Sequence, residues 1–292
     1  MNKFIPKGMG WIPDLPDARD YTFRHKAILP LLQKLKQTRN EKLPDEVDLR
    51  CDDEGGYFTL PENQGSLNCS SAFAALSLVE YFERRVCGRT FEGSKLFLYK
   101  MARNYSHKQL RPTGDIGADM RTTLKILTSI GVPPEEHWPY DVEKFDQEPS
   151  PFVYSLAKPF CNLRYFRLDE PNSDGATTWK TIKSFLAAGF PIAFGFSVPN
   201  SLTADANIPY RPNLDGVRGG QAAVAVGYGN HHFGPNQHAL LIRNSWGSQW
   251  GDNGNGWFPV ASIRKQLARD FWTIMNEEWT SSIELLKPDL VD

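Results

Sequence analysis

Cysteine is scarce in this chain, and long apolar runs are missing. Only four of the 292 residues are cysteines, and their separations fit neither a metal site nor a dense disulfide framework. No apolar stretch is long enough to cross a bilayer, so we expect no membrane-spanning segment. The first eleven residues contain Pro6 and Lys7 instead of a continuous apolar core, so we also expect no signal peptide.

The chain also lacks an excess of charge of either sign. It has 33 Lys and Arg against 34 Asp and Glu, which gives a net charge of −1, and 40% of its residues are hydrophobic. This is the composition of an ordinary globular protein with a large core. It gives no sign of nucleic-acid or membrane binding, of a cofactor or of a metal, and it leaves the oligomeric state open.

One stretch changes character abruptly. Residues 63–73 are polar and turn-forming, whereas residues 74–82 are apolar nearly all round. This contrast predicts a loop that leads into a buried helix. We expect Asn68 or Ser70 to cap the first turn and Gly88 to end the helix. Backbone N–H groups at such a helix start would stabilise an anion, for example a thiolate nucleophile.

Two further motifs lie in the second half of the chain. Residues 219–228 have the sequence Gly-Gly-Gln-Ala-Ala-Val-Ala-Val-Gly-Tyr, and residues 244–247 have the sequence Asn-Ser-Trp-Gly. Together with Gln64, which stands six residues before Ser70, these motifs resemble those of the papain family of cysteine peptidases, in particular its bacterial members. The resemblance covers about residues 43–275.

The resemblance implies a role for each motif. In the family a Gln contributes to the oxyanion hole, a Cys at the start of the central helix is the nucleophile, a His takes its proton and an Asn orients the His. These positions correspond here to Gln64, Ser70, Gln221 and Asn244. Cys69 lies one place too early, and one helical step is about 100° of rotation, so we expect its thiol to point elsewhere.

The replacements at Ser70 and Gln221 remove the reactive groups. An amide cannot accept a proton at neutral pH, and a hydroxyl without an adjacent base is a weak nucleophile. General base catalysis is typically worth roughly 10²–10⁴-fold. We therefore expect an inactive peptidase homologue, in which the Gln64 side chain and the Ser70 N–H could still bind a carbonyl or carboxylate oxygen.

The leading hypothesis is a pseudopeptidase that binds an extended peptide or a protein partner in the cleft between two lobes. The resemblance places Gly114, Gly117, Gly220 and Trp246 in the substrate-binding part of that cleft. Backbone pairing with a peptide would survive the loss of the reactive groups. A second non-enzymatic hypothesis is a structural module whose own N-terminal extension fills the cleft.

An active enzyme is the alternative. Cys69, or Ser70 with His231 or His232 as a substitute base, could carry out hydrolysis or acyl transfer. The chain could also be an enzyme whose nucleophilic Cys was deliberately replaced by Ser, although Gln221 is a second departure from the family pattern. Plainer roles are a cap or hydrogen-bonding group at Ser70, an amide at Gln221 bonded to Asn244 or Ser70, and a buried apolar residue at Cys69.

The predicted fold is α+β, with an N-terminal extension over residues 1–42 and a papain-like domain over residues 43–292. In that domain we expect a helical lobe over about 43–165, an antiparallel, barrel-like β lobe over about 166–280, and a C-terminal tail. Besides the central helix, we predict helices that begin near 94 and 120 and one over 179–188, and strands over 191–196, 222–228, 239–243, 257–260 and 271–275.

Leu67 bears on the cellular compartment. Secreted members of the family usually have a disulfide-bonded Cys three residues before the nucleophile, and Leu67 stands at that position. Disulfides are rare in reducing compartments, so the missing bridge favours a cytoplasmic location.

Overall fold

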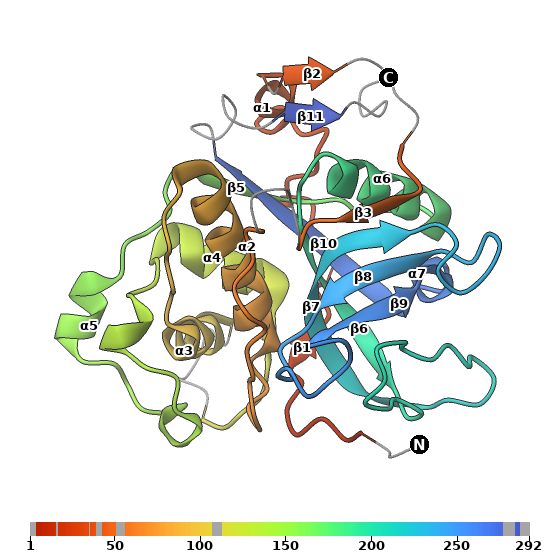
Figure 1. The fold of residues 1–292 in the computed structure, drawn as a ribbon. Helices are drawn as coiled ribbons and strands as arrows, with labels where there is room; N and C mark the ends of the chain where they lie inside the picture. Colours follow the sequence, from red (N-terminus) through yellow and green to blue (C-terminus); the bar gives the residue numbers. More distant parts are fainter. Residues whose placement is uncertain are drawn as a thin grey trace.

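The computed structural model describes residues 4–15, 17–34, 36–38, 43–50, 56–106, 113–276 and 284–286. These residues form two halves that lie side by side, one mostly helical and one built on a β-sheet (Figure 1). The helices are α1 Leu29–Lys34, α2 Ser70–Cys87, α3 Lys95–Ser106, α4 Met120–Ser129, α5 Pro151–Leu156, α6 Gly175–Ala187 and α7 Val260–Arg264, with 3-10 turns η1 Glu135–His137 and η2 Val142–Lys144.

Helix α2 is the central element of the helical half. Every side chain from Ser70 to Phe82 is buried, and the helix contacts α3 and α4 as well as strand β7 of the sheet. Gly88 follows α2 in the left-handed conformation (φ 61°), which ends the helix without a steric penalty. The predicted buried helix and its glycine end are therefore confirmed.

The second half of the molecule is dominated by one antiparallel sheet. The strands of the chain are β1 Trp11–Ile12, β2 Lys36–Thr38, β3 Glu46–Asp48, β4 Ala118–Asp119, β5 Leu163–Arg167, β6 Ile192–Pro199, β7 Val217–Gly229, β8 Ala239–Arg243, β9 Asn255–Pro259, β10 Ala268–Asn276 and β11 Glu284–Leu286. The main sheet has the order β5-β10-β6-β7-β8-β9, and β3 pairs with β7. In the described chain β5 does not pair with β9, so the barrel-like sheet is not a closed barrel.

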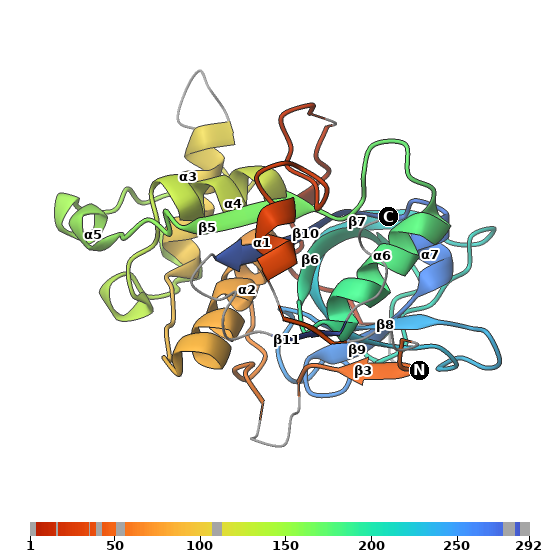
Figure 2. The same cartoon turned by 90° about the horizontal axis from the view of Figure 1, so that it is seen from above.

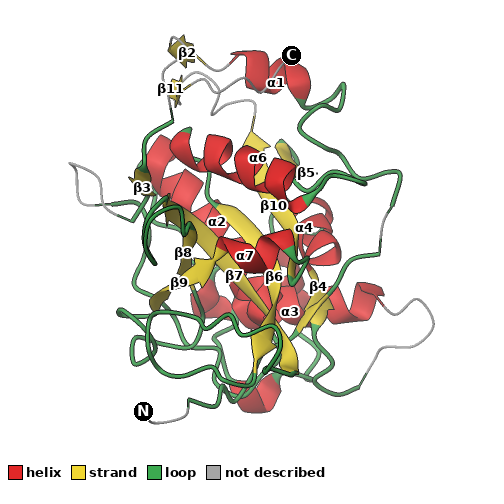
Figure 3. Ribbon diagram, turned by 90° about the vertical axis from the view of Figure 1, so that its right-hand side faces the viewer, coloured by secondary structure: helices red, strands yellow, loops and turns green. Residues whose placement is uncertain are grey.

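Helices α6 and α7 cover the sheet. Seen from above, they lie on the side of the molecule away from α3–α5 (Figure 2). Figure 3 shows α7 in front of β6 and β7, with α6 above it. The sheet therefore has helices on both sides, and the predicted α+β architecture with two lobes is confirmed.

The N-terminal segment runs between the two halves (Figure 1). Its strand β1 pairs in parallel with β4 of the helical half and also contacts β6 and β7 of the sheet. Farther along, β2 pairs in parallel with β11 near the other end of the chain. Pro30 lies in the first turn of α1, where its missing N–H leaves no helical hydrogen bond unmade.

Most of the predicted elements are present. The helices expected near 94, 120 and 179–188 are α3, α4 and α6, and the five predicted strands are β6 to β10 with slightly different ends. Helix α6 begins earlier than predicted because the Asp174 carboxylate accepts a hydrogen bond from the Thr177 N–H and caps it. Helix α5 and strand β5 were not predicted. None of the helices in the described ranges combines the length and apolar character that a membrane span requires.

Candidate functional site

Ser70 is the first residue of α2 and is fully buried. Its hydroxyl oxygen accepts a hydrogen bond from the Ala222 N–H at 3.0 Å, which joins the helix start to strand β7. The expectation that Asn68 or Ser70 caps the helix was wrong. Cys69 holds the cap position without a side-chain hydrogen bond, because the Asn68 side chain binds the Met9 N–H and the Ser70 side chain binds β7.

Three buried amide side chains meet beside Ser70. Gln221 Nε2, on β7, lies 2.9 Å from Gln64 Oε1 and 2.8 Å from Asn244 Oδ1. It also lies 3.2 Å from the hydroxyl of Ser245, which itself donates to Gln64 Oε1 at 2.6 Å. The Ser245 N–H donates to Asn244 Oδ1 and fixes the orientation of that amide. The structure thus brings together Gln64, Ser70, Gln221 and Asn244.

Two atoms of this amide cluster lack a hydrogen-bond partner among the described residues. Gln221 Oε1 and Asn244 Nδ2 are buried and make no hydrogen bond within the described residues. The expected bond from Gln221 to Asn244 is confirmed, whereas Ser70 is bonded to the backbone of β7 instead. No basic side chain among the described residues is hydrogen-bonded to the Ser70 hydroxyl, so the arrangement holds the two halves together but provides no acceptor for its proton.

A carbonyl oxygen of the N-terminal segment lies against two donors at this cluster. The Met9 carbonyl accepts hydrogen bonds from Gln64 Nε2 at 2.8 Å and from the Ser70 N–H at 3.2 Å. These are the two donors that we expected to bind a carbonyl or carboxylate. The ligand in the structure is therefore the backbone of the chain itself.

Residues 8–12 make backbone contacts with both halves. The Gly10 N–H donates to the Gly220 carbonyl at 2.9 Å, and the Ala118 N–H donates to the Gly10 carbonyl at 3.0 Å. The Trp246 indole donates to the Gly8 carbonyl at 3.2 Å. The segment is thus paired on each side in the manner of an added strand.

Glycines on both sides make this close approach possible. A Cβ atom on Gly117 would lie 2.4 Å from the Gly10 carbonyl oxygen, and one on Gly220 would lie 2.5 Å from the Trp11 carbonyl oxygen. Of the four residues predicted to bind a substrate, Gly117, Gly220 and Trp246 therefore contact the N-terminal segment. Gly114 has open space where a Cβ would be, and its N–H is bonded to the Asp146 carboxylate instead.

Trp11 anchors the segment to the sheet. Its ring is buried against Gly195, where a Cβ would lie only 1.8 Å away, and its indole donates to the Asp270 carboxylate at 3.1 Å. Sequence reasoning missed Met9, Trp11 and Asp270. The signal that could have found them is Gly8-Met9-Gly10-Trp11, an extended stretch with alternate glycines.

Asp14 is a buried acid that also attaches the N-terminal segment to the sheet. Its N–H donates to the same oxygen of Asp270 at 2.8 Å, and its carboxyl accepts from the Trp272 indole at 3.2 Å. Burial, together with the nearby carboxylates of Asp270 and Asp119, raises the pKa of the Asp14 carboxyl to about 9, and the charge of Arg121 opposes this shift. The surroundings of Asp14 therefore favour its protonated form.

Cys69 points away from the cluster. Its thiol is fully buried and lies 3.0 Å from the Tyr140 hydroxyl, which in turn donates to the Gln64 carbonyl. Burial raises the pKa of the Cys69 thiol to about 12, although the hydrogen bond with Tyr140 opposes the shift. The expectation of a buried, misdirected thiol is confirmed, and this thiol is not a candidate nucleophile.

The two histidines considered as substitute bases lie elsewhere. His231 and His232 follow Gly229, at the opposite end of β7 from Gln221. The His232 ring stacks on Trp257 and its Nε2 contacts the Asn207 side chain, while His231 Nδ1 accepts from the Asn236 N–H. The hypothesis that either histidine serves Ser70 or Cys69 as a base is therefore wrong.

The fold and this site define a two-lobed α+β protein of papain type. The family model for the papain family cysteine proteases matches residues 43–274. The chain therefore belongs to the papain family of cysteine proteases.

Relatives of the chain come from several kinds of organism. An uncharacterized peptidase C1-like protein of Acanthamoeba polyphaga mimivirus is 33% identical over 290 residues, which cover 92% of this chain and 87% of that protein. The crystal structure of xylellain, a cysteine protease from Xylella fastidiosa, has a TM-score of 0.72 and 29% identity over 94% of this chain and 99% of that one.

A more distant structure shares the fold. The proCathepsin B S9 of Trypanosoma congolense has a TM-score of 0.66 at 16% identity, with 92% of this chain and 86% of that one covered. Since the matches include both a viral relative and a bacterial structure, the expected bacterial type stays a prediction.

Proposed function

We propose that this chain is a pseudopeptidase: Ser70 and Gln221 take the places of the family's nucleophile and base, and the site binds an extended peptide backbone without cleaving it. The observation that carries this proposal is the Met9 carbonyl oxygen, which accepts hydrogen bonds from both Gln64 Nε2 and the Ser70 N–H. A carbonyl held by these two donors, with no attacking group beside it, is a bound ligand and not a reacting substrate.

The protonation chemistry supports inactivity. The Gln221 amide has no basic lone pair and already donates to neighbouring oxygens. The Ser70 hydroxyl oxygen is engaged by the Ala222 N–H. Burial raises the pKa of the Cys69 thiol to about 12, so its thiolate form is strongly disfavoured at neutral pH. Neither Ser70 nor Cys69 is therefore activated as a nucleophile.

The occupant that the contacts favour is the chain's own segment of residues 8–12. A Cβ on Gly8 would lie 2.2 Å from the Leu67 carbonyl oxygen, and one on Gly10 would lie 1.9 Å from the Asn68 carbonyl oxygen. The segment therefore fits its passage only with glycines at these two positions. We infer that it braces the two lobes as an intramolecular ligand, which is the structural-module hypothesis.

An external peptide or protein segment is the second candidate ligand. The specific observation in its favour is that the hydrogen bonds of Gly220, Ala118 and Trp246 are made to backbone atoms of the segment, and any extended peptide could reproduce those bonds. Such a partner would have to displace residues 8–12. A cytoplasmic location remains part of the proposal; it still rests on Leu67, and Cys69 and Cys161 form no disulfide within the described residues.

A labelled peptide with the sequence of residues 4–14 tests the occupancy. The wild-type protein should not bind it, because its own segment fills the site. The protein variant Gly10→Ala should bind it, because the added Cβ would clash with the Asn68 backbone and release the segment. The matched control is Gly114→Ala, which has a similar positive φ but open space at the Cβ position, and it should not bind the peptide.

Two outcomes would count against this proposal. Equal binding to the wild-type and Gly10→Ala proteins would mean that the site is not occupied. Failure of a folded Gly10→Ala protein to bind the peptide would mean that these backbone contacts do not constitute a peptide site. Fluorescence anisotropy measures the binding, and the thermal midpoint of each variant shows that it is folded.

A further inference from the structure

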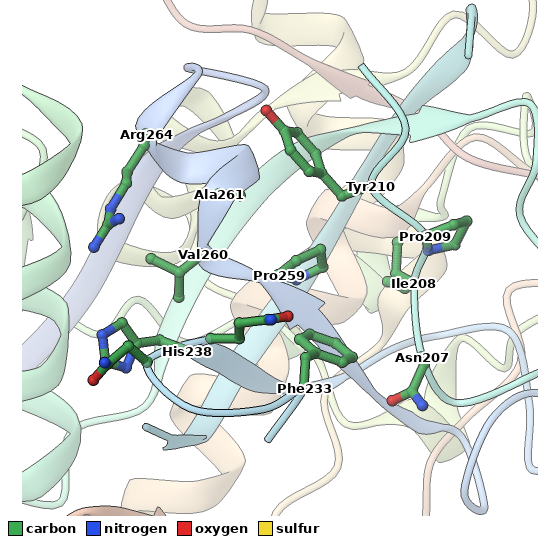
Figure 4. Close-up of a pocket in the computed structure, with 12 residues that line it drawn as sticks. Asn207, Ile208, Pro209, Tyr210, Phe233, His238, Pro259, Val260, Ala261 and Arg264 are labelled. Carbon is green, nitrogen blue, oxygen red and sulfur yellow. The ribbon is translucent and has the colours of Figure 1, made fainter. Parts of the chain in front are cut away.

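A cavity of about 450 Å³ lies in the sheet half, outside the contacts of the N-terminal segment (Figure 4). It is formed by the loop over residues 207–210, the loop between β7 and β8, and the junction of β9 with α7. Cavities of roughly 300–1,000 Å³ are the size that holds small organic ligands. The catalytic motifs of the family do not contribute to it.

The walls of this cavity are fixed by backbone hydrogen bonds. The Ile208 N–H donates to the Trp257 carbonyl at 2.9 Å, and the Trp257 N–H donates to the Ala206 carbonyl at 2.7 Å, so this loop extends the sheet beyond β9. On the other side the Val260 N–H donates to the His238 carbonyl at 3.1 Å. The cavity is therefore preformed on a rigid frame.

One part of the lining is apolar. Ile208 and Val260 are almost fully buried, and the rings of Phe233 and Tyr210 are half-buried beside them. In Figure 4 Tyr210 and Ile208 stand across the cavity from Arg264 and His238. The apolar surface is suited to an aromatic or aliphatic group of a ligand.

The other part of the lining contains one cation, Arg264, and one ionisable ring, His238. Arg264 is exposed and forms no ion pair with a described residue. His238 Nδ1 is buried and likewise has no hydrogen-bond partner in the described chain. Burial lowers the pKa of His238, and the positive charges of Lys183, Arg264 and His231 lower it further, while a hydrogen bond to the Asn230 backbone opposes them. Arg264 thus supplies a positive charge at this wall of the cavity, and His238 supplies a ring nitrogen without a hydrogen-bond partner among the described residues.

We propose that this cavity binds a small organic anion, with its acidic group between Arg264 and His238 and its apolar part against Ile208, Phe233 and Val260. The anion would supply the charge partner that Arg264 lacks, and it would favour the protonated form of His238, which can then donate from Nδ1. A carboxylate and a phosphate monoester share this chemistry, and the probes below separate them. The proposal does not depend on the inactivity of the interlobe site.

Four probes test the requirement for both charge and an apolar group. Isothermal titration calorimetry of the full-length protein would compare 3-phenylpropionate, phenyl phosphate, the neutral 3-phenylpropionamide and inorganic phosphate. We expect at least one aromatic anion to bind at one site with a Kd of about 0.1–5 mM, the range expected of so small a ligand. The neutral amide and inorganic phosphate should each bind at least about tenfold more weakly. The preferred aromatic anion identifies the acidic group.

A pair of variants locates the binding. Arg264→Met retains an unbranched apolar side chain and removes the charge, so it should weaken binding of the aromatic anion at least about tenfold. Lys265→Met removes the neighbouring exposed charge, which does not line the cavity, and should change the Kd less than about twofold. In proton NMR titrations the bound anion should raise the pKa of His238 in the wild-type protein, and by less in Arg264→Met.

Three results would overturn the proposal. The first is no saturable binding of either aromatic anion up to about 50 mM, tenfold above the upper end of the expected Kd range. The second is equal binding of the neutral amide. The third is an equal loss in Lys265→Met and Arg264→Met, which would indicate general electrostatic attraction and not a site. Both substitutions are at exposed positions, so both variants should fold, and their thermal midpoints check this.

Discussion

Replacing Trp11 should detach the N-terminal segment while the rest of the chain stays folded. Trp11 is only 7% exposed, packs on Gly195 and donates to Asp270, so Trp11→Ala removes most of the anchor. Truncation of a buried Trp to Ala typically costs about 3–5 kcal/mol. If this cost falls on the docking of the segment, the population of the detached state should rise about 150- to 5,000-fold.

Hydrogen exchange measures the population of the state in which the segment is detached. The Ala118 N–H donates to the Gly10 carbonyl and is exposed to solvent when the segment leaves, whereas Val224, in the middle of β7, should keep its protection. We expect exchange at Ala118 to accelerate about 150- to 5,000-fold in Trp11→Ala, with little change at Val224.

A second tryptophan provides the control. Trp257 stacks on His232 at the far end of the sheet, and Trp257→Ala should not accelerate exchange at Ala118 selectively. Equal acceleration at Ala118 and Val224 in Trp11→Ala would refute the reasoning, because the segment would then unfold only together with the whole domain.

Three further predictions concern buried polar groups. Asp14 has a pKa of about 9 in the folded chain against an ordinary value of 3.8, so the folded chain keeps a proton that the unfolded chain loses. The free energy of unfolding should therefore fall as the pH rises from about 4 to 9. Urea unfolding at several pH values should show a flatter slope for Asp14→Asn. Cys69, with its pKa near 12 instead of 9, should react with iodoacetamide at least about 10³-fold more slowly than the exposed Cys161. Peptide mass spectrometry measures both rates. Rapid labelling of Cys69 would support the enzymatic alternative. Gln221→Ala should lower the free energy of unfolding by about 2–4 kcal/mol in chemical denaturation, since it removes the amide that joins Gln64 to Asn244 and leaves a cavity. A loss below about 0.5 kcal/mol would show that this amide does not hold the lobes together.

The parts of the site that follow from local sequence were predictable. The apolar run after residue 73 indicated a buried helix, and Gly88 indicated its end. The separation of the motifs that contain Gln64, Gln221 and Asn244 implied that their side chains would meet, because the family fold brings those motifs together. Asn68 was assigned the wrong role, since its side chain had a more distant partner, the Met9 N–H, that local sequence does not show.

The occupant of the site was not predictable in the same way. Gln64 and Met9 are 55 residues apart, and nothing in the composition of residues 4–15 shows which carbonyl would meet the Gln64 amide. Strand β5, Leu163–Arg167, was missed because its partner β10 lies about a hundred residues later and its own sequence has two arginines. Long-range pairing determines both features.

Peptide cleavage by the wild-type protein is the most direct test of the central claim. The protein would be incubated with a quenched fluorescent peptide library and, in parallel, with an activated ester, followed by intact-protein mass spectrometry. We predict no turnover above the buffer blank and no acyl adduct on Ser70 or Cys69, because neither has a base beside it. Steady turnover, or a stoichiometric adduct on either residue, would contradict the account.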